Sequence, residues 1–355
     1  MSKPKKTTIQ DIANYAQVSV GTIDRVIHNR GKVSPIKKKK IEEAIEHLNF
    51  NPNLLARTLA LGKQFFICTL IPEAKTSQNY WSLPLRGVEQ FASNYKDFGI
   101  EIEAHEYSLF EEDSFMEQAR VIAEKNPDGV VLAPLFEKES IQFAQLLDDK
   151  KIPYVFIDAN IPSQNALTYI GPESGTSGFI GARLLNTLLA PADNILVVNM
   201  AKGVDNSAHI GVVENGFRNF FKEHQQSPDR KVFTLTIPSS EESDIARELT
   251  KFYIKNPDIK GVFVTNSMAS AVSKFHRTHE LDIKLVGFDL VESNVEELKN
   301  GGIEFLISQS PVFQGKRAIQ TLFDFFVYRK EPSLVQYVPI DVIMKENVDY
   351  YINAQ

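Results

Sequence analysis

The residue types of this chain offer little for covalent or metal chemistry. Its seven histidines are scattered, and the single cysteine, Cys68, lies inside an apolar run typical of a strand. No His/Cys group therefore has the spacing of a metal site, and no Cys/His pair suggests a nucleophile. The motifs G-x-G-x-x-G, G-x-x-x-x-G-K-[ST] and G-x-S-x-G do not occur. We predict no metal, no cofactor, no catalytic residue and no enzymatic activity.

Cationic residues gather at the N-terminus, where they could bind a polyanion. Residues 1–63 contain 12 Lys+Arg against 5 Asp+Glu, a net charge of +7, whereas the remainder contains 27 against 40, a net charge of −13. Such a basic module on an acidic body is typical of nucleic-acid binding. Basic N-terminal tails without that role are also common, so charge alone leaves both alternatives open.

The composition is that of a globular protein that stays in the cytoplasm. A chain of 355 residues with 43% hydrophobic residues is long enough for two or three domains. A lone cysteine can form no internal disulfide, and no apolar segment follows the opening MSKPKKTTIQ. Neither secretion nor membrane insertion is therefore expected.

Apolar periodicity predicts three short helices in residues 1–50. The first covers IQDIANYA (9–16), the second follows Ser19 as N-cap, and the third begins at Pro35 after Ser34. Two short helices joined by a tight turn are typical of a helix-turn-helix, whose second helix lies in the major groove of DNA. A small helical bundle with a solvated charged face is the alternative.

The basic segment closely resembles the N-terminal headpiece of the lactose-repressor (LacI/GalR) family. The pattern D-[IV]-A-x-x-A-x-V-S-x-x-T-[IV]-x-R-V is matched by Asp11, Ile12, Ala13, Ala16, Val18, Ser19, Thr22, Ile23, Arg25 and Val26. A second pattern, N-x-x-P-N-x-x-A-x-x-L, is matched in part by Asn51, Pro52, Asn53, Ala56 and Leu59. The resemblance implies a sequence-specific DNA-binding protein.

The resemblance also assigns roles on the second helix. Val20, Gly21 and Arg25 occupy base-reading positions, because a guanidinium can bind guanine and a valine can touch a thymine methyl. Ser19 and Thr22 occupy positions that contact the DNA backbone.

Two features qualify these roles. Asp24 departs from the serine common in the family, and we expect it to alter operator choice without abolishing binding. Lysines 37 to 40 either add nonspecific attraction to DNA or form a solvated helix face.

Residues 51–62 resemble the family's hinge helix and linker. The segment NLLARTLA (53–60) is too short to be stable alone, and the resemblance implies that it folds on DNA in the minor groove. Asn53, Ala56 and Arg57 would contact DNA there, and Leu59 would act as an apolar wedge. An ordinary linker with a buried leucine is the alternative.

The acidic body alternates short apolar strands with amphipathic helices, which predicts an α/β fold with parallel sheets. About 280 residues favour two lobes with a ligand cleft between them. Strands are expected at 65–71, 129–135, 153–159, 194–200, 261–267 and 283–289. Helices are expected at about 82–97, 114–125, 138–149, 174–189, 209–224, 241–255 and 311–328.

The body resembles the periplasmic-binding-protein-like effector domain of the same family, close to ribose-type sugar-binding proteins. The resemblance implies a two-lobed effector-binding and dimerisation domain over residues 63–355, with lobe 1 at about 63–172 and 304–330 and lobe 2 at about 173–303 and 331–345. The implied effector-binding residues are Tyr80, Trp81, Asp158, Asn266, Asp289 and Gln309. Carboxylates and amides there suit sugar hydroxyls, and an aromatic ring suits a sugar's C–H face.

Each of these residues has a structural alternative. Asp158 and Asp289 could cap turns, Trp81 could be core, Gln309 could hold a crossover between the lobes, and Glu173 is a weaker candidate. Sugar-binding members carry an arginine where this chain has Val213, and the nearest polar residues are Asn206 and His209. This departure leaves a modified sugar, a polyol or another small polar metabolite open.

Together these features predict a homodimeric transcription regulator, such as a repressor, that binds operator DNA and is controlled allosterically by a small effector. The alternatives are a sugar receptor, an enzyme whose head serves dimerisation, and a DNA-binding protein with a vestigial cleft.

Overall fold

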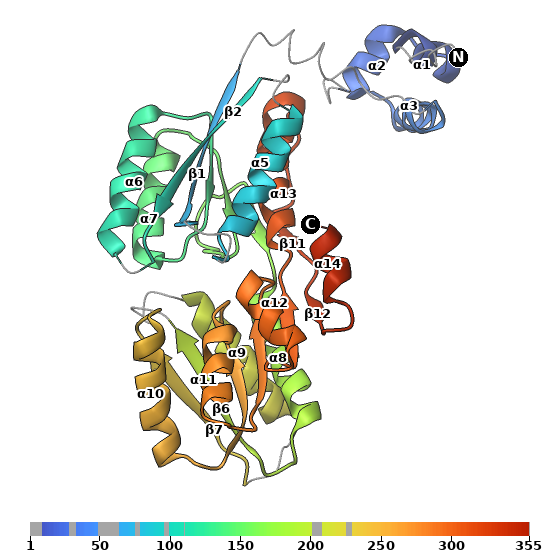
Figure 1. Cartoon of the computed structure of the whole chain (residues 1–355). Helices are drawn as coiled ribbons and strands as arrows, with labels where there is room; N and C mark the ends of the chain where they lie inside the picture. The colour runs from blue at the N-terminus through green and yellow to red at the C-terminus, as the bar shows by residue number, and fades with distance from the viewer. Residues whose placement is uncertain are drawn as a thin grey trace.

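The computed structural model contains a helical headpiece and a two-lobed α/β body, as the sequence predicts (Figure 1). None of the described helices is both long and apolar enough to cross a membrane. The structure describes residues 9–27, 33–48, 64–74, 79–95, 99–109, 111–200, 208–224 and 229–354.

The headpiece consists of α1 (Ile9–Ala16), α2 (Val20–Ile27) and α3 (Pro35–His47). α1 is followed by Gln17, whose φ of 54° lies in the left-handed region, and Val18 N donates to Ala13 O at 3.1 Å. This Schellman-type end turns the chain sharply into α2. The three helices bury a small apolar core of Ile12, Ala13, Ala16, Ile23, Ile41 and Ala44.

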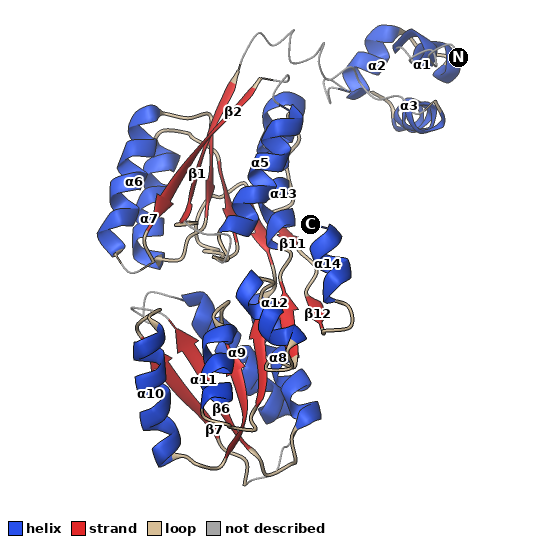
Figure 2. Cartoon of the chain, in the orientation of Figure 1, coloured by secondary structure: helices blue, strands red, loops and turns tan. Residues whose placement is uncertain are grey.

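Lobe 1 is a parallel six-stranded sheet with helices on both faces (Figure 2). Its strand order is β11-β5-β4-β3-β1-β2. The strands are β1 (Phe65–Pro72), β2 (Ile100–Tyr107), β3 (Gly129–Leu132), β4 (Tyr154–Ile157), β5 (Thr168–Gly171) and β11 (Val335–Tyr337). One face packs on α5 (Ser82–Tyr95) and α13 (Pro311–Tyr328), the other on α6 (Glu112–Lys125) and α7 (Glu137–Asp149).

Lobe 2 repeats this arrangement, with one antiparallel strand at its edge. Its strand order is β12-β10-β9-β8-β6-β7. The strands are β6 (Asn194–Met200), β7 (Val232–Ile237), β8 (Ile259–Val264), β9 (Lys284–Phe288), β10 (Phe305–Ser308) and β12 (Asp341–Ile343). One face packs on α8 (Ser174–Leu188) and α9 (Ala208–Glu223), the other on α10 (Glu242–Lys255), α11 (Ala269–Thr278), α12 (Glu292–Lys299) and α14 (Val348–Ala354).

The structure corrects the predicted lobe limits at two strands. β10 pairs with β9, so residues 305–308 belong to lobe 2 and not to lobe 1. β11 pairs with β5, so residues 335–337 belong to lobe 1 and not to lobe 2. The chain therefore passes between the lobes after β5, after β10 and after β11. Strands of three or four residues carry too little periodicity to reveal these crossings.

Each lobe contains one pair of helices in very close contact. A Cβ on Gly315 of α13 would overlap the carbonyl oxygen of Pro84 in α5. In the same way, a Cβ on Gly178 of α8 would overlap the carbonyl oxygen of Val213 in α9. These two glycines set the helix spacing, because any side chain would push the backbones apart.

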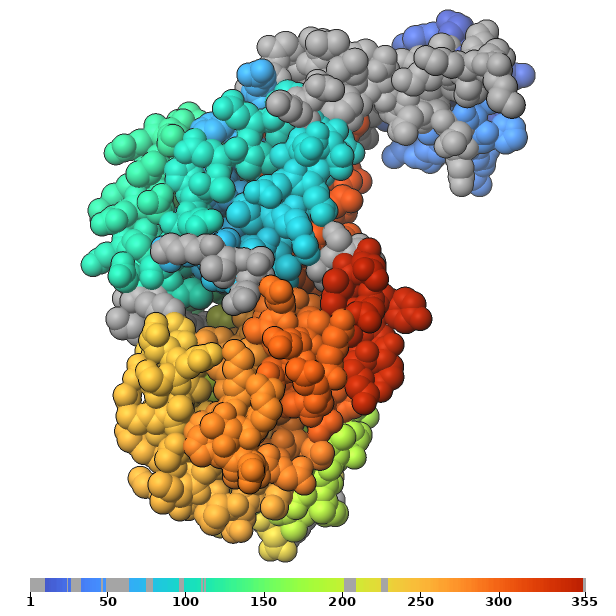
Figure 3. Space-filling model, viewed as in Figure 1, coloured from blue at the N-terminus to red at the C-terminus, as the bar shows by residue number. Residues whose placement is uncertain are grey.

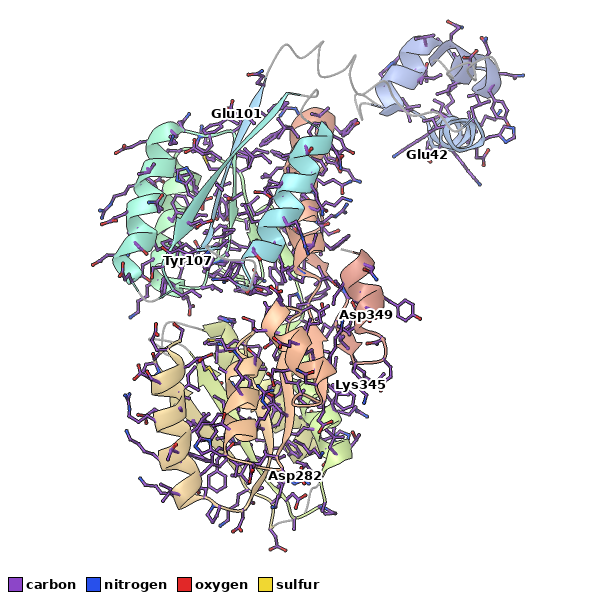
Figure 4. All side chains as sticks on the ribbon, in the orientation of Figure 1. Glu42, Glu101, Tyr107, Asp282, Lys345 and Asp349 are labelled. Carbon is purple, nitrogen blue, oxygen red and sulfur yellow. The ribbon has the colours of Figure 1, made fainter. Side chains whose placement is uncertain are left out.

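The carboxyl ends of the strands in the two lobes face each other. In Figure 4, Glu101 lies at the outer end of β2 and Tyr107 at the end nearer lobe 2, while Asp282, just before β9, lies at the far end of lobe 2. Figure 3 shows the lobes touching on the viewed face. Val291, which precedes α12, is buried in the apolar core of lobe 1. The loops after the strands thus line the junction of the lobes, as expected for an α/β binding site.

Candidate functional site

The first candidate site is the exposed N-terminal half of α2. Ser19 Oγ and Thr22 Oγ1 are 2.9 Å apart, and Thr22 N donates to Ser19 O at 2.8 Å, so the two hydroxyls lie together where the helix begins. Val20 is 40% exposed. Arg25 Nε donates to Gly21 O at 3.0 Å, which holds the guanidinium along the helix. The structure thus brings the predicted base-reading and phosphate-contacting residues onto one solvent-exposed stretch of helix.

Other predicted DNA contacts are only partly described. Asn53, Ala56, Arg57 and Leu59 lie outside the described residues, and so does the side chain of Asp24. Lys38 of α3 lies 4.0 Å from Glu42, and both side chains are more than half exposed. This geometry agrees with a solvated helix face for the lysine run, because exposed ion pairs contribute little.

The second candidate site lies at equivalent strand ends of the two lobes. Asp158 follows β4 and Asp289 follows β9, and both have a φ of 67°. The amide of Asp158 donates to Ile170 O at 3.3 Å, and that of Asp289 donates to Ile307 O at 2.9 Å. Aspartate is one of the few residues that tolerate this left-handed conformation. The same left-handed backbone conformation therefore places one carboxyl group from each lobe at the junction of the lobes.

Asp158 is held by side chains of lobe 1. Tyr80 OH donates to its Oδ1 at 2.5 Å, and its amide also donates to Gln314 Oε1 at 2.9 Å. Burial raises the pKa of the Asp158 carboxyl, while His209 and the Tyr80 hydroxyl oppose the rise. Burial also raises the pKa of Tyr80 well above its usual range, with the charges of Asp158 and Asp289 adding to the effect. Tyr80 thus remains a protonated donor.

Asp289 is less well satisfied. It is only 4% exposed, and its Oδ1 has no hydrogen-bond partner within the described part of the chain. Burial raises its pKa well above the usual range, and the negative charge of Asp158 raises it further. Burial lowers the pKa of His209, which keeps this imidazole neutral at pH 7, although Asp158 opposes the shift. The site therefore holds two carboxyl groups beside a neutral histidine and can accept several hydroxyl hydrogens from a ligand.

A cavity of about 510 Å³ adjoins these groups between the lobes. Its walls come from the segments after β3, β4 and β5, the start of α9, and β11. Ala159 and His209 connect it to Asp158, because Ala159 is the next residue and His209 interacts with its charge. The lining residues are Pro134, Leu135, Glu137, Ala159, Asn160, Ile161, Pro162, Ser163, Tyr169, Pro172, Glu173, Ser174, His209, Val212 and Tyr337.

Some predicted effector residues make contacts that are structural. Trp81 is 4% exposed in the apolar core of lobe 1, and its ring meets that of Tyr80 edge-on at 4.9 Å. Asn266 Nδ2 donates to Met200 O at 2.8 Å, which ties the end of β8 to the end of β6. Glu173 caps α8 by accepting from Thr176 N at 2.6 Å.

Gln309 and Gln314 lie on the crossover between β10 and α13. Gln309 is half-buried, and its carbonyl accepts from Gln314 Nε2 at 2.9 Å. Gln314 is buried and links this crossover to the amide of Asp158, a role that the sequence analysis missed. Its signal was a glutamine on the same helix face as Pro311, Ala318 and Leu322, which are buried. Tyr169, also missed, donates to Pro172 O at 2.7 Å and lies 3.1 Å from Asp158 O.

The described residues contain no group of three His, Cys, Asp or Glu side chains that could hold a metal ion. The carboxyl groups and the imidazole of the interlobe site can form hydrogen bonds with a polar organic ligand.

The fold and the two sites define a helix-turn-helix headpiece joined to a binding domain of the periplasmic type. Residues 8–53 match the bacterial regulatory proteins of the lacI family, and residues 68–327 match the periplasmic binding protein domain. The chain belongs to the lacI family and is a DNA-binding transcription regulator with a periplasmic-binding-protein-like body.

Known proteins of this type align with most of the chain. It is 32% identical to a crystal structure from Bacteroides fragilis described as a LacI transcriptional regulator, with a TM-score of 0.76, over 81% of this chain and all of that one. The ribose operon repressor of Halalkalibacterium halodurans is 27% identical over 309 residues, 80% of each chain.

A shorter alignment joins the chain to the regulator RegA of Clostridium acetobutylicum. The two are 33% identical over 156 residues, which are 42% of this chain and 43% of RegA. RegA and the ribose repressor are described as transcription regulators and not as enzymes.

Proposed function

We propose that the protein binds operator DNA as a homodimer and that a small polar effector, a sugar, controls this binding from the interlobe site. The observation that carries the proposal is the pair Asp158 and Asp289, which two separate lobes place at one buried junction. Carboxyl groups accept the hydrogens of sugar hydroxyls, and Tyr80 adds a polar ring beside them. The name of the ribose operon repressor, which aligns over most of this chain, supports a sugar.

The departure at α9 defines which sugars fit. Val213 stands where a guanidinium is expected and is buried against α8, and His209 is a polar residue near the start of α9. A neutral imidazole makes fewer and weaker hydrogen bonds than an arginine fork. The effector is therefore held mainly by hydrogen-bond acceptors, the carboxyl groups of Asp158 and Asp289.

DNA binding uses the exposed stretch of α2. Arg25 and Val20 read base edges, Ser19 and Thr22 contact phosphates, and Asp24 shifts operator preference. Gly21 offers no side chain, and a Cβ there would meet nothing within 4 Å among the described residues. Less sequence is read at that position.

The hinge residues complete the DNA interface. Asn53, Ala56 and Arg57 contact the minor groove, and Leu59 kinks the central base step. Two headpieces related by twofold symmetry suit a palindromic operator in the cytoplasm.

Coupling between the sites requires only that the effector bind two states of the dimer with different affinity. An effector that touches Asp158 and Asp289 contacts both lobes, so it stabilises the lobe arrangement that brings these residues together. Linkage then requires operator DNA to change effector affinity by the same factor.

DNA binding by the full chain tests the proposal. Fluorescence anisotropy on DNA from upstream of the protein's own gene should give a steep loss of affinity with rising salt. Arg25→Ala should weaken binding by about 1–3 kcal/mol and relax sequence preference. Gln10→Ala, an exposed change on α1, is the matched control and should change little. A sugar panel should contain a compound that shifts the binding curve.

Salt-insensitive binding without sequence preference, or equal behaviour of the two variants, would contradict the DNA-binding mode. A binding curve that no sugar shifts would contradict the effector class.

A further inference from the structure

The interlobe cavity extends beyond the two carboxyl groups that define the effector site. None of Tyr80, Asp158 and Asp289 lines it, yet Ala159 and His209 join it directly to Asp158. Its volume of about 510 Å³ falls within the range of about 300–1,000 Å³ that holds drug-sized ligands. A ligand bound between the carboxyl groups can therefore continue into this space.

The cavity wall has two kinds of surface. Leu135, Ile161 and Tyr169 are buried and contribute apolar surface, while Val212 and Tyr337 are 45% and 64% exposed and mark the rim. Polar groups come from residues that include Glu137, Asn160, Ser163 and Ser174, and further apolar surface comes from Ala159 and three prolines. An aromatic and aliphatic side beside polar groups suits a ring with one apolar face and hydroxyls at its edge.

The charges of the described lining residues disfavour an anionic ligand. None of the described residues that line the cavity is Lys or Arg, and Glu137 and Glu173 add two carboxylates to those of Asp158 and Asp289. His209 is half-buried, and its Nδ1, which is itself buried, has no hydrogen-bond partner among the described residues. As a neutral imidazole it can bind a hydroxyl group, but it cannot balance a phosphate or a sugar acid.

We propose that the effector is an uncharged glycoside of at least two units. One sugar ring binds between Asp158 and Asp289, and the second unit occupies the cavity between His209 and Tyr337. This inference rests on the proposed function, because it takes the sugar-binding role of the interlobe site as given and names the ligand class.

Calorimetry on the full chain tests the two-unit ligand. The single-ring probes are D-ribose, D-glucose and D-galactose, the two-ring probes are maltose, cellobiose and lactose, and the anionic probe is glucose 6-phosphate. We expect a two-ring probe to bind at least about 10-fold more tightly than any single-ring probe, and the phosphate to bind most weakly.

Two variants of neighbouring exposed residues locate the second unit. Tyr337→Ala removes the rim of the cavity, and Leu334→Ala changes a residue that is 78% exposed beside β11 and absent from the lining. Tyr337→Ala should remove the roughly 10-fold advantage of the two-ring probe and leave single-ring binding within about twofold. Leu334→Ala should change neither affinity.

The outcomes separate this inference from the proposed function. Equal affinity for one and two rings, tighter binding of glucose 6-phosphate, or equal weakening of both probe classes by Tyr337→Ala would overturn the two-unit ligand while the sugar effector stands. Failure of every neutral sugar to bind would overturn the sugar effector itself and this inference with it.

Discussion

Each lobe places one aspartate at the junction with the same backbone conformation, but the two carboxyl groups differ in their hydrogen bonds. Asp158 and Asp289 share a φ of 67°, and the backbone amide of each donates a hydrogen bond to the neighbouring strand. Asp158 accepts the Tyr80 hydroxyl, whereas Asp289 Oδ1 has no partner in the described part of the chain. The carboxyl group of Asp158 in lobe 1 is thus partly used to hold Tyr80. That of Asp289 in lobe 2 keeps one oxygen available for a ligand.

A buried amide side chain supports each aspartate, again with a difference. Gln314 of α13 bonds the Asp158 amide and the Gln309 carbonyl. Asn294 of α12 donates to Phe288 O at 2.7 Å and to Asp289 O at 3.3 Å, and it accepts from Ser270 N at 2.8 Å. The support in lobe 1 therefore involves a crossover between lobes, whereas the support in lobe 2 is internal.

The largest expected effect tests whether the stability of each lobe depends on its own closely packed helix pair. Gly178→Ala and Gly315→Ala should each lower the free energy of unfolding by about 3 kcal/mol, the upper end of the usual cost of overpacking, because the new Cβ overlaps a backbone carbonyl. Gly211→Ala on α9 is the control, since its Cβ meets nothing within 4 Å among the described residues. Urea denaturation measures the three variants. A loss no greater than that of the control would show that the helices can separate cheaply.

Removal of the amide supports should have effects of equal or smaller size. Asn294→Ala should cost about 3 kcal/mol, because it leaves several buried backbone groups without partners, each worth roughly 1–3 kcal/mol. Gln314→Ala should cost about 2 kcal/mol, because it makes fewer bonds. Urea denaturation ranks the two variants, and only Gln314→Ala should also change how effector shifts DNA affinity. If both variants changed the effect of the effector on DNA affinity equally, the support of Asp158 would not differ from that of Asp289 in linking the lobes.

The two carboxyl groups themselves should differ in ligand binding. Asp289→Asn should weaken the bound sugar by up to about 100-fold, because losing an acceptor oxygen leaves a buried hydroxyl of the ligand unpaired, at a cost of about 1–3 kcal/mol. Asp158→Asn should cost about 10-fold, since its Oδ1 is already shared with Tyr80. Calorimetry with any sugar that binds the unchanged chain measures both. Equal losses would mean that the Tyr80 bond does not distinguish the lobes.

The smallest expected effect is the pH dependence of the ligand-free protein. Burial raises the folded-state pKa values of Asp158 and Asp289 above the ordinary aspartate value of 3.8, so the folded state holds their protons more tightly. The stability that they contribute is fully present below about pH 3.8 and is lost as the pH rises through the folded-state pKa values. Each group changes the free energy of unfolding by at most about 1.4 kcal/mol per pH unit.

Urea denaturation across this pH window checks the sign. Asp289→Asn should flatten the slope more than Asp158→Asn, because burial and the neighbouring charge raise the pKa of Asp289 well above its usual range. If neither variant changed the pH dependence of the free energy of unfolding, other titratable groups would be responsible for it.

The sequence by itself determined the local elements and the chemistry at their ends. Helical spacing and N-caps placed α1, α2 and α3, because these depend on residues three or four apart. Long apolar runs identified β1, β6, β8 and β9, and the family resemblance identified Asp158 and Asp289 at strand ends. Short or half-exposed strands such as β7 and β11 were missed, because their period is weak.

Only the tertiary structure decided which distant segments share an environment. β10 joins lobe 2 and β11 joins lobe 1 through pairings that no local pattern encodes. Trp81 is core, Gln314 supports Asp158 from 156 residues away, and Tyr337 lies at the rim of a cavity. Burial and pKa depend on all neighbours in space, and chain crossings bring those neighbours together, so they follow from the fold and not from local sequence.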